Sequence, residues 1–422
     1  MSGPLYLPFD HDEILVYIDS LILEGLLSPV SSGSADKLSR SWISVGLQID
    51  VGSDRLRRLE GLGERIRDLI PAPDAKHQEW LDFAFRWAGF LALLYSAENP
   101  PPQKFLGMAK DLQREVEERF FTWALERYAG LYNQAPVPPM MMHHIARAMV
   151  REVNEFPERK LALIVVDGLA LDQWIVLREA FAKQRRKFAL RENAVFAWIP
   201  TVTSVSRQSL FAGKPPLYFP SSIHAMSKEP SLWFQFWLDK GLNQAQIAYM
   251  IGLGNGESER LKEVSENPKV RVAGLIVDKV DKIMHGMELG TQGMHNQILQ
   301  WGLQGHLAKM IDLLLEQKFG VWLTSDHGNI EAEGIGRPLE GAIADIKGER
   351  VRVYSDHGLR DQVKAAFPET IEWPAIGLPE NYLPLIAQGR SAFTPEENKT
   401  VAHGGISIDE IIVPLIEIES GS

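Results

Sequence analysis

From Lys160 onward, short apolar runs recur along the chain, with helical stretches between them. The first run, Leu161–Val166, is apolar at every position, which suits a central strand of a parallel sheet that is buried on both faces. Strands that alternate with helices imply an α/β sheet with helices on both of its faces. The further strands are expected at Val195–Ile199, Ile247–Ile251, Val272–Val277, Val321–Thr324 and Ile411–Ile416.

Residues 1–155 carry a different pattern, with apolar residues spaced three and four apart and no strand-like run. This spacing predicts helices. We therefore expect an all-α N-terminal domain over residues 1–155, for structure or partner docking, before an α/β domain over residues 160–422. The helices are expected at Asp12–Leu27, Asp54–Leu69, His77–Ser96 and Ala109–Tyr128, and from Met140 to about Glu155.

The pattern loosens between about Ile330 and Thr400, where glycine and proline are frequent. Within it, Arg350–Tyr354 alternates as an edge strand does. We interpret this segment as an insertion placed to cover an active site.

Composition excludes several classes of site. The 422 residues include no cysteine, so disulfides, thiolate zinc sites and cysteine nucleophiles are ruled out. A net charge of −11 gives no overall electrostatic footprint for nucleic acid, whose binding stays open. The first residues lack a basic stretch followed by an apolar one, so we expect no signal peptide, no membrane partner and a cytoplasmic protein.

Polar residues follow four of the predicted strands. In open α/β sheets ligands bind at the carboxyl ends of the strands, so these residues are expected to converge on one edge. They are Asp167, Thr203, Ser204, Asp278, Asp281, Asp326 and His327.

Aspartate and histidine together form a ligand set for divalent metals such as zinc or manganese. Asp281 and His285 are four apart, so they share one face of a helix, whereas Asp278 competes with Asp281 without that spacing. Asp326 and His327 are adjacent, and both can reach one ion only if the chain turns there, which Gly328 permits.

Four segments carry a resemblance to the alkaline phosphatase superfamily. Thr324–Asn329 resembles the Thr-Ala-Asp-His-Gly-Asn signature of its phosphoglycerate mutase and phosphopentomutase branches, and Val165–Gly168 resembles its first metal-ligand strand. Pro200–Gly213 is similar to the nucleophile stretch of nucleotide pyrophosphatases. His403–Gly405, followed by Glu410–Leu415, is similar to the last ligand and the final strand.

More narrowly, Lys160–Glu419 resembles a PglZ domain, a type associated with BREX bacteriophage-defence systems. The resemblance implies a metal-dependent phosphodiesterase or phosphatase, with diesters on nucleotide-like substrates favoured by the Pro200–Gly213 stretch. It also implies two divalent ions (Zn, Mn or Mg) and other defence-system proteins as partners, for which the N-terminal helices would be the docking module.

Carried over residue by residue, the resemblance makes Thr203 the nucleophile that attacks phosphorus, giving a covalent phosphothreonine that is then hydrolysed. One ion would be held by Asp167, Thr203, Asp326 and His327, and the other by Asp281, His285 and His403.

Several assignments have alternatives. Ser204 is the alternative nucleophile, although Thr203 lies at the preferred distance from Gly213. Arg207 contacts a phosphate oxygen or makes a surface salt bridge, and Asn329 binds a substrate oxygen or caps a turn. We treat the second Ser-Asp-His-Gly, Ser355–Gly358, as a coincidence in a loop. The histidines at 143, 144, 295 and 306 match nothing in the pattern and are expected at the surface or in the core.

The same residues bear on three other functions. A sulfatase is disfavoured because Thr203 stands where a modified Cys or Ser is needed and Val205 replaces the proline or alanine of that motif. A phosphomutase shares the signature at Thr324–Asn329. A scaffold or adaptor of a defence complex, with a structural metal site, is the alternative from another class.

Overall fold

The computed structural model describes residues 51–96, 101–255, 258–338 and 344–421 of the chain. The helix expected at Asp12–Leu27 lies outside these residues. The other helices expected in the first third are confirmed, with small shifts of their ends. They are α3 (Val51–Leu69), α4 (His77–Leu94), α5 (Gln103–Arg127) and α6 (Met142–Glu155).

A six-stranded sheet with the order β2-β13-β5-β1-β4-β3 forms the centre of the fold. The neighbours β5, β1, β4 and β3 pair in parallel, as the continuous apolar runs predict. The final strand, β13, instead runs antiparallel to both β2 and β5, so the sheet is mixed. The strands are β1 (Lys160–Val166), β2 (Phe188–Phe196), β3 (Ile247–Leu253), β4 (Val272–Val277), β5 (Phe319–Thr324) and β13 (Ile412–Ser420).

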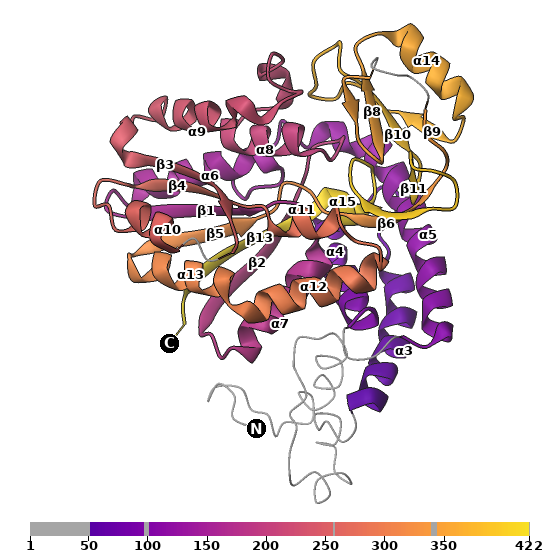
Figure 1. Cartoon of the computed structure of the whole chain (residues 1–422), viewed down its shortest axis with the longest axis horizontal. Helices are drawn as coiled ribbons and strands as arrows, with labels where there is room; N and C mark the ends of the chain where they lie inside the picture. The colour runs from indigo at the N-terminus through magenta and orange to yellow at the C-terminus, as the bar shows by residue number, and fades with distance from the viewer. Residues whose placement is uncertain (1–50, 97–100, 256–257, 339–343, 422) are drawn as a thin grey trace, which may run out of the picture.

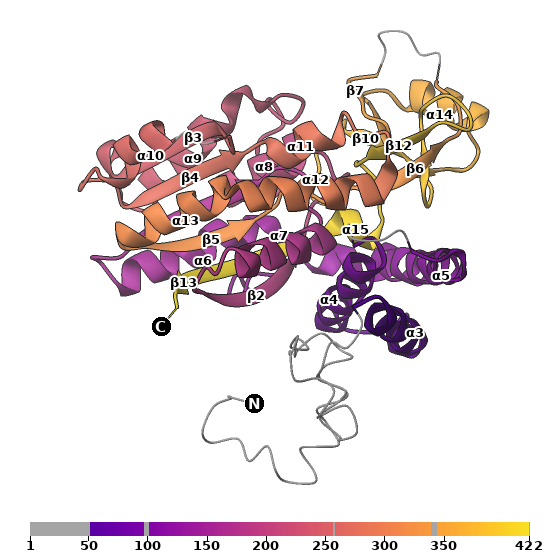
Figure 2. The same cartoon turned by 60° about the horizontal axis from the view of Figure 1, so that its bottom comes forward.

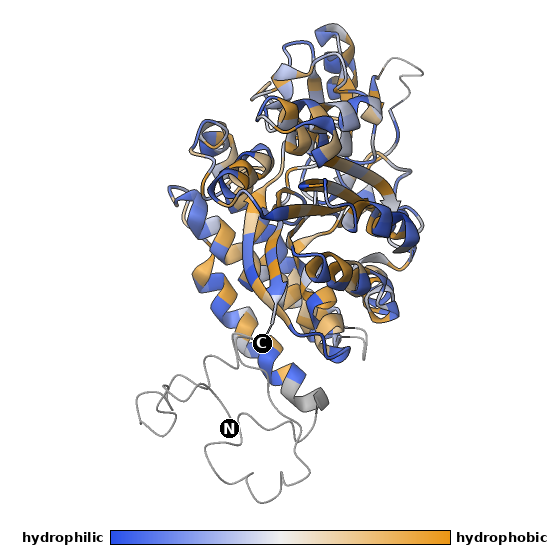
Figure 3. Ribbon diagram, turned by 90° about the vertical axis from the view of Figure 1, so that its left-hand side faces the viewer, coloured by the Kyte–Doolittle hydropathy of each residue, from blue (hydrophilic) through white to orange (hydrophobic). Residues whose placement is uncertain are grey.

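Helices cover both faces of this sheet, as predicted for an α/β fold (Figure 1). One layer consists of α6, α8 (Thr203–Ala212) and α9 (Glu229–Leu238), and the other of α7 (Leu171–Lys183), α12 (Gly290–Gln304) and α13 (His306–Glu316). The strands are mostly apolar, whereas the helices alternate apolar and polar segments (Figure 3). This is the pattern of a sheet buried between two amphipathic layers.

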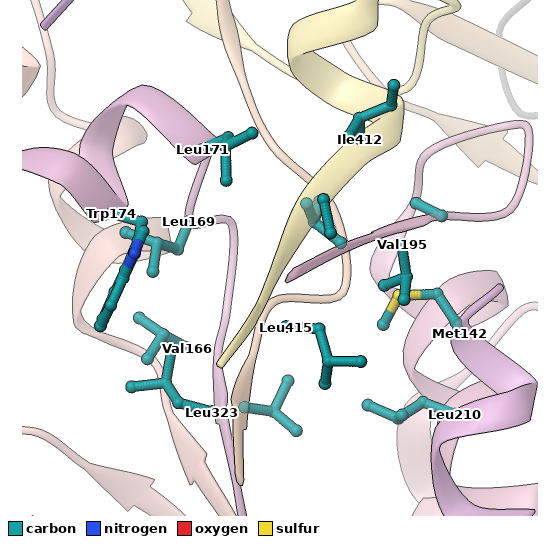
Figure 4. Close-up of a cluster of buried hydrophobic side chains, with 14 of the residues drawn as sticks. Met142, Val166, Leu169, Leu171, Trp174, Val195, Leu210, Leu323, Ile412 and Leu415 are labelled. Atoms are coloured by element: carbon teal, nitrogen blue, oxygen red, sulfur yellow. The ribbon is translucent and has the colours of Figure 1, made fainter. Parts of the chain in front are cut away.

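The core is continuous from the sheet into the N-terminal helices. Val166, Leu323 and Leu415 belong to the same buried cluster as Met142 of α6 (Figure 4). Trp123 of α5 belongs to the same core and stacks on Phe196 of β2, with ring centroids 5.5 Å apart. Burying an aromatic side chain of this size contributes roughly 1.5–3 kcal/mol, so these helices stabilise the sheet directly.

The insertion begins where β5 ends. It forms one sheet of order β7-β8-β10-β9 and a second of order β11-β6-β12, with α14 (His357–Ala366) alongside. Its strands are β6 (Ile330–Gly334), β7 (Ile346–Lys347), β8 (Val351–Tyr354), β9 (Thr370–Glu372), β10 (Leu383–Ala387), β11 (Ser391–Ala392) and β12 (Lys399–Ala402).

The strand predicted at Arg350–Tyr354 is confirmed as β8, but its predicted place at a sheet edge is wrong, because β8 lies between β7 and β10 and is buried along its length. Alternating arginines normally mark a solvated face. Here Arg350 is buried and donates to both carboxylate oxygens of Glu410, and Arg352 lies over the ring of Phe393. Long-range partners therefore reverse the local signal.

The remaining helices are α10 (Ser258–Ser265), α11 (Lys279–Met284) and α15 (Ile408–Ile411). The N-terminal helices α4 and α5 lie against α15, just beyond the insertion (Figure 2). Within the described residues, every helix is too short or too polar to cross a bilayer.

His143 and His144 are core residues, fully buried in α6. Burial, with the neighbouring His144, lowers the pKa of His143 to about 3, and burial lowers that of His144 to about 4. An exposed histidine in the unfolded chain titrates near ~6.5, so the unfolded state binds more protons between these values.

The free energy of unfolding should therefore fall as the pH drops below about 6.5, by up to about 1.4 kcal/mol per pH unit for each histidine. Urea unfolding of the wild type and of His143→Gln at a series of pH values checks this. In the variant, the free energy of unfolding should change less steeply with pH, by about the contribution of one histidine. Equal slopes would contradict the assignment.

Candidate active site

Three ligand-type side chains meet where β1 and β5 end. Asp167 follows β1, while Asp326 and His327 follow β5, the neighbouring parallel strand. One ligand atom from each lies within 4.8 Å of the others, and all three residues are buried. The Nε2 atom of His327 is 3.9 Å from Asp167 Oδ1 and 3.8 Å from Asp326 Oδ2. The pairing of β1 with β5 therefore brings together residues that are far apart in sequence.

Backbone hydrogen bonds leave one face of these residues free. Asp326 Oδ1 accepts from the N–H groups of Gly168 and His327, whereas Asp326 Oδ2 is buried without a hydrogen-bond partner, as is Asp167 Oδ1. His327 donates through Nδ1 to the carbonyl of Gly328, which leaves Nε2 unprotonated. Two carboxylate oxygens with lone pairs available thus converge with one unprotonated imidazole nitrogen.

A second group is formed by Asp281, His285 and His403. Asp281 lies on α11, the short helix after β4, and His285 directly follows this helix, with Asp281 Oδ1 3.3 Å from His285 Nε2, as their spacing predicts. His403 follows β12 and donates through Nδ1 to the carbonyl of Thr201 at 2.8 Å, which leaves its Nε2 free. Asp278, the competitor of Asp281, pairs with Lys282 at 2.7 Å instead.

The two groups adjoin each other through stacked histidines. The rings of His327 and His403 lie 3.8 Å apart and nearly parallel. The insertion explains this contact, because its first strand β6 starts just after His327 and its last strand β12 ends just before His403. These two strands pair antiparallel, with Ala402 opposite Ile330.

Burial sets the protonation of the first group and of His403. It raises the pKa of Asp167 to about 7, with help from the charge of Asp326 and against that of Arg207. Burial also raises the pKa of Asp326, lowers that of His327 and lowers that of His403 to about 4. In the first group, buried carboxylates with unpartnered oxygens lie beside a neutral imidazole, a donor set that suits a divalent cation. The second group is more exposed, and the hydrogen bond to Asp281 raises the pKa of His285, so its fit to an ion rests on its residue types and on the proximity of their ligand atoms.

Thr203 is the first residue of α8, and its hydroxyl lies 3.0 Å from His327 Nε2. Because this nitrogen carries no proton, the hydroxyl donates to it. Ser204 lies next in the helix, where its carbonyl accepts from the side chain of Gln208. The contact with a residue of the first group distinguishes Thr203 from Ser204.

Arg207 does not make a surface salt bridge, because its side chain is only 4% exposed. It donates to Asp167 Oδ2 and, through Nε, to Glu229 at 2.8 Å. A phosphate contact by Arg207 stays a prediction.

The amide of Asn329 is bonded at both ends. It donates to the carbonyl of Gly168 at 2.7 Å and accepts from Gln173 at 2.8 Å. These bonds tie the end of β5 to the turn after β1, and substrate binding by Asn329 stays a prediction.

The residues set aside in the sequence lie outside both groups. In the second Ser-Asp-His-Gly, Asp356 caps α14 by accepting from Leu359 N–H, as an ordinary helix cap does. His295 is buried and bonded to Asp172 at 2.7 Å, and His306 begins α13.

Sequence reasoning missed the residues that support the groups through long-range bonds. Thr201 holds the His403 loop by accepting from Gly404 N–H and donating to the Gly405 carbonyl. Glu410 accepts from Gly405 N–H and from Ser407. Ser407 and Glu410 have the spacing of a capping box, which was a signal available in the sequence.

Gly328 is required for a different reason from the one expected. A Cβ at this position would lie 1.9 Å from the backbone oxygen of Asp409, so close packing against α15 excludes any side chain. Gly328→Ala should lower the free energy of unfolding by about 1–3 kcal/mol, because a methyl group must displace backbone. Gly89→Ala in α4, where a Cβ meets nothing within 4 Å, is the control in urea unfolding and should not destabilise. Equal stability of Gly328→Ala and the wild type would contradict the packing argument.

Comparison with known proteins agrees with this architecture. The family described as the BREX system PglZ alkaline phosphatase-like domain matches residues 145–418. No curated protein matches the chain.

Among solved structures, the chain is similar to murine ectonucleotide pyrophosphatase/phosphodiesterase 5 in complex with AMP, with 13% identity over 61% of this chain and 88% of that one and a TM-score of 0.48. It is also similar to the phosphonoacetate hydrolase of Sinorhizobium meliloti in complex with phosphonoformate, with 15% identity over 62% of this chain and 90% of that one and a TM-score of 0.41. The family match spans more than half of the chain, which therefore belongs to the family of BREX system PglZ alkaline phosphatase-like domains.

Proposed function

We propose that this chain is a two-metal phosphoester hydrolase that acts on phosphodiesters of nucleotide type in a bacterial phage-defence system. One observation carries the proposal. Two groups of three ligand-type side chains adjoin each other, and the Thr203 hydroxyl lies 3.0 Å from His327 Nε2 of the first group. The defence context comes from the family to which the chain belongs.

Asp167, Asp326 and His327, with Thr203, would hold one divalent ion, and Asp281, His285 and His403 the other. When bound, such a pair supplies positive charge at the attacking and leaving oxygens of an in-line displacement. Zn, Mn and Mg are the candidates.

The protein's own residues then have separate tasks. The contact with His327 Nε2 places the Thr203 hydroxyl, which is the nucleophile, beside the first group, and this hydrogen bond would give way where the nitrogen ligates an ion. The position of Thr203 at the start of α8 favours an anionic phosphoryl group there, because the positive end of the helix dipole faces it. Backbone bonds to Asp326, His327 and His403 fix these side chains before substrate arrives.

We further propose that residues 1–155 form a helical module for docking other defence-system proteins, with residues 160–422 as the catalytic domain. The preference for diesters rests on the resemblance of Pro200–Gly213 to the nucleophile stretch of nucleotide pyrophosphatases. Residues 330–400 would be the insertion that limits access to the site.

The test is hydrolysis of bis-p-nitrophenyl phosphate and p-nitrophenyl phosphate by protein stripped with a chelator and reloaded with Zn²⁺, Mn²⁺ or Mg²⁺. We expect metal-dependent cleavage, faster on the diester. A folded protein that binds two ions and turns over neither ester would contradict hydrolysis, and would favour a scaffold with a structural metal site or a phosphomutase with a specific substrate.

A further inference from the structure

Arg207 connects the first ligand group to a buried chain of polar residues behind it. It lies on α8 four residues after Thr203, and its NH1 atom donates to Asp167 Oδ2 and lies 3.9 Å from Asp326 Oδ2. The guanidinium is therefore placed between both carboxylates of the group.

Glu229 fixes this guanidinium from the far side, and Tyr249 fixes Glu229. Glu229, at the start of α9, accepts from Arg207 Nε at 2.8 Å and is 1% exposed. The hydroxyl of Tyr249, on β3, donates to the other oxygen of Glu229. Asp167 and Glu229 thus hold Arg207 directly, at NH1 and Nε of its planar fork, and Tyr249 in turn holds Glu229.

This arrangement gives the two oxygens of Asp167 different surroundings. Oδ2 is taken by Arg207, whereas Oδ1 is buried without a partner and is the atom near His327 Nε2. A carboxylate with one oxygen fixed by arginine has one oxygen left for an ion, in one orientation. The two oxygens of Asp326 differ in the same way, because Oδ1 accepts two backbone N–H groups and Oδ2 has no hydrogen-bond partner.

The charges of Asp167, Asp326 and Arg207 also favour a positioning role for the arginine. Asp167 and Asp326 are buried carboxylates in one small space, and their repulsion opposes keeping both ionised as ligands. A fixed buried cation beside them offsets this repulsion, and Glu229 keeps that cation from being left unpaired on its other side.

We propose that Arg207, held by Glu229 and Tyr249, is a positioning residue that fixes Asp167 as a one-oxygen ligand of the first ion. It is then not a phosphate clamp. The inference rests on the proposed function, because it assumes that Asp167, Asp326 and His327 bind an ion.

The experiment titrates Mn²⁺ calorimetrically into metal-stripped full-length protein, with no substrate. Arg207→Met and Glu229→Gln should each lower the affinity for one of the two Mn²⁺ ions by roughly 10–100-fold, which is the usual effect of losing a residue that orients a ligand. The affinity for the other ion should not change. Tyr249→Phe, which removes only a hydroxyl, should weaken the same ion to a smaller extent and decides the matter if Arg207→Met does not fold.

Arg390→Met is the matched control, because Arg390 also pairs with two carboxylates, Glu117 and Asp409, which belong to neither ligand group. It should leave both affinities unchanged. In an Asp326→Asn background, which lacks the first ion, adding Arg207→Met should not change the affinity of the remaining ion.

Wild-type affinities in the folded Arg207, Glu229 and Tyr249 variants would overturn the proposal while leaving the hydrolase intact. If Arg207→Met kept the wild-type ion affinities and raised KM for the diester, Arg207 would be a phosphate contact instead. A wild type that binds no Mn²⁺ would overturn both this inference and the proposed function.

Discussion

Thr203→Ala is expected to lower kcat for diester hydrolysis by on the order of 10⁴-fold or more, because the nucleophile is removed. The variant should still bind two ions, since Asp167, Asp326 and His327 remain in the first group. Steady-state kinetics with bis-p-nitrophenyl phosphate and Mn²⁺ calorimetry on the same samples measure both effects.

Two variants sharpen this prediction. Thr203→Ser keeps a hydroxyl at the start of α8 and should retain part of the activity. Ser204→Ala should retain most of it, because His327 contacts the hydroxyl of Thr203. The opposite pattern, with Ser204→Ala inactive and Thr203→Ala active, would make Ser204 the nucleophile.

Asp326→Asn should abolish binding of the first ion and reduce kcat/KM by at least ~100-fold. Residues that merely orient a ligand cost ~10–100-fold when replaced, and a ligand itself should cost more. The substitution is nearly isosteric, and the retained amide oxygen can still accept from the N–H groups of Gly168 and His327. The loss would therefore report the missing charge at Oδ2 rather than a collapsed turn.

Asp356→Asn provides the matched control, because it makes the same change in the second Ser-Asp-His-Gly. Asp356 caps α14 and belongs to neither ligand group. Its replacement should leave activity and ion binding at wild-type values and change stability by less than about 1 kcal/mol. Full activity of Asp326→Asn, or equal losses in both variants, would contradict the role given to Asp326.

The sequence predicts those features of the fold that depend on local pattern. The run Val272–Val277 matches β4 in both its first and its last residue, because a strand buried on both faces is apolar at every position. Asp281 and His285 lie together because residues four apart share a helix face. The resemblance of Thr324–Asn329 led to Asp326 and His327, which the structure places beside Asp167.

Features that depend on long-range contacts are beyond such reasoning. The pattern of Arg350 and Arg352 predicts a solvated edge strand. In the structure Arg350 instead pairs with Glu410 in the interior, and Arg352 lies over the ring of Phe393. The sequence gives no signal that Glu229 pairs with Arg207 or that Tyr249 pairs with Glu229, because α8, α9 and β3 approach one another only in the folded chain. The direction of β13 is likewise set by its pairing with β2 and β5 rather than by its own apolar run.

The central claim is that two ions bind side by side next to Thr203. Anomalous diffraction from crystals of the protein grown with Mn²⁺ tests it most directly. We predict one peak bounded by Asp167, Asp326 and His327, and a second bounded by Asp281, His285 and His403, with the Thr203 hydroxyl against the first. Peaks elsewhere, or none at saturating Mn²⁺, would contradict the account.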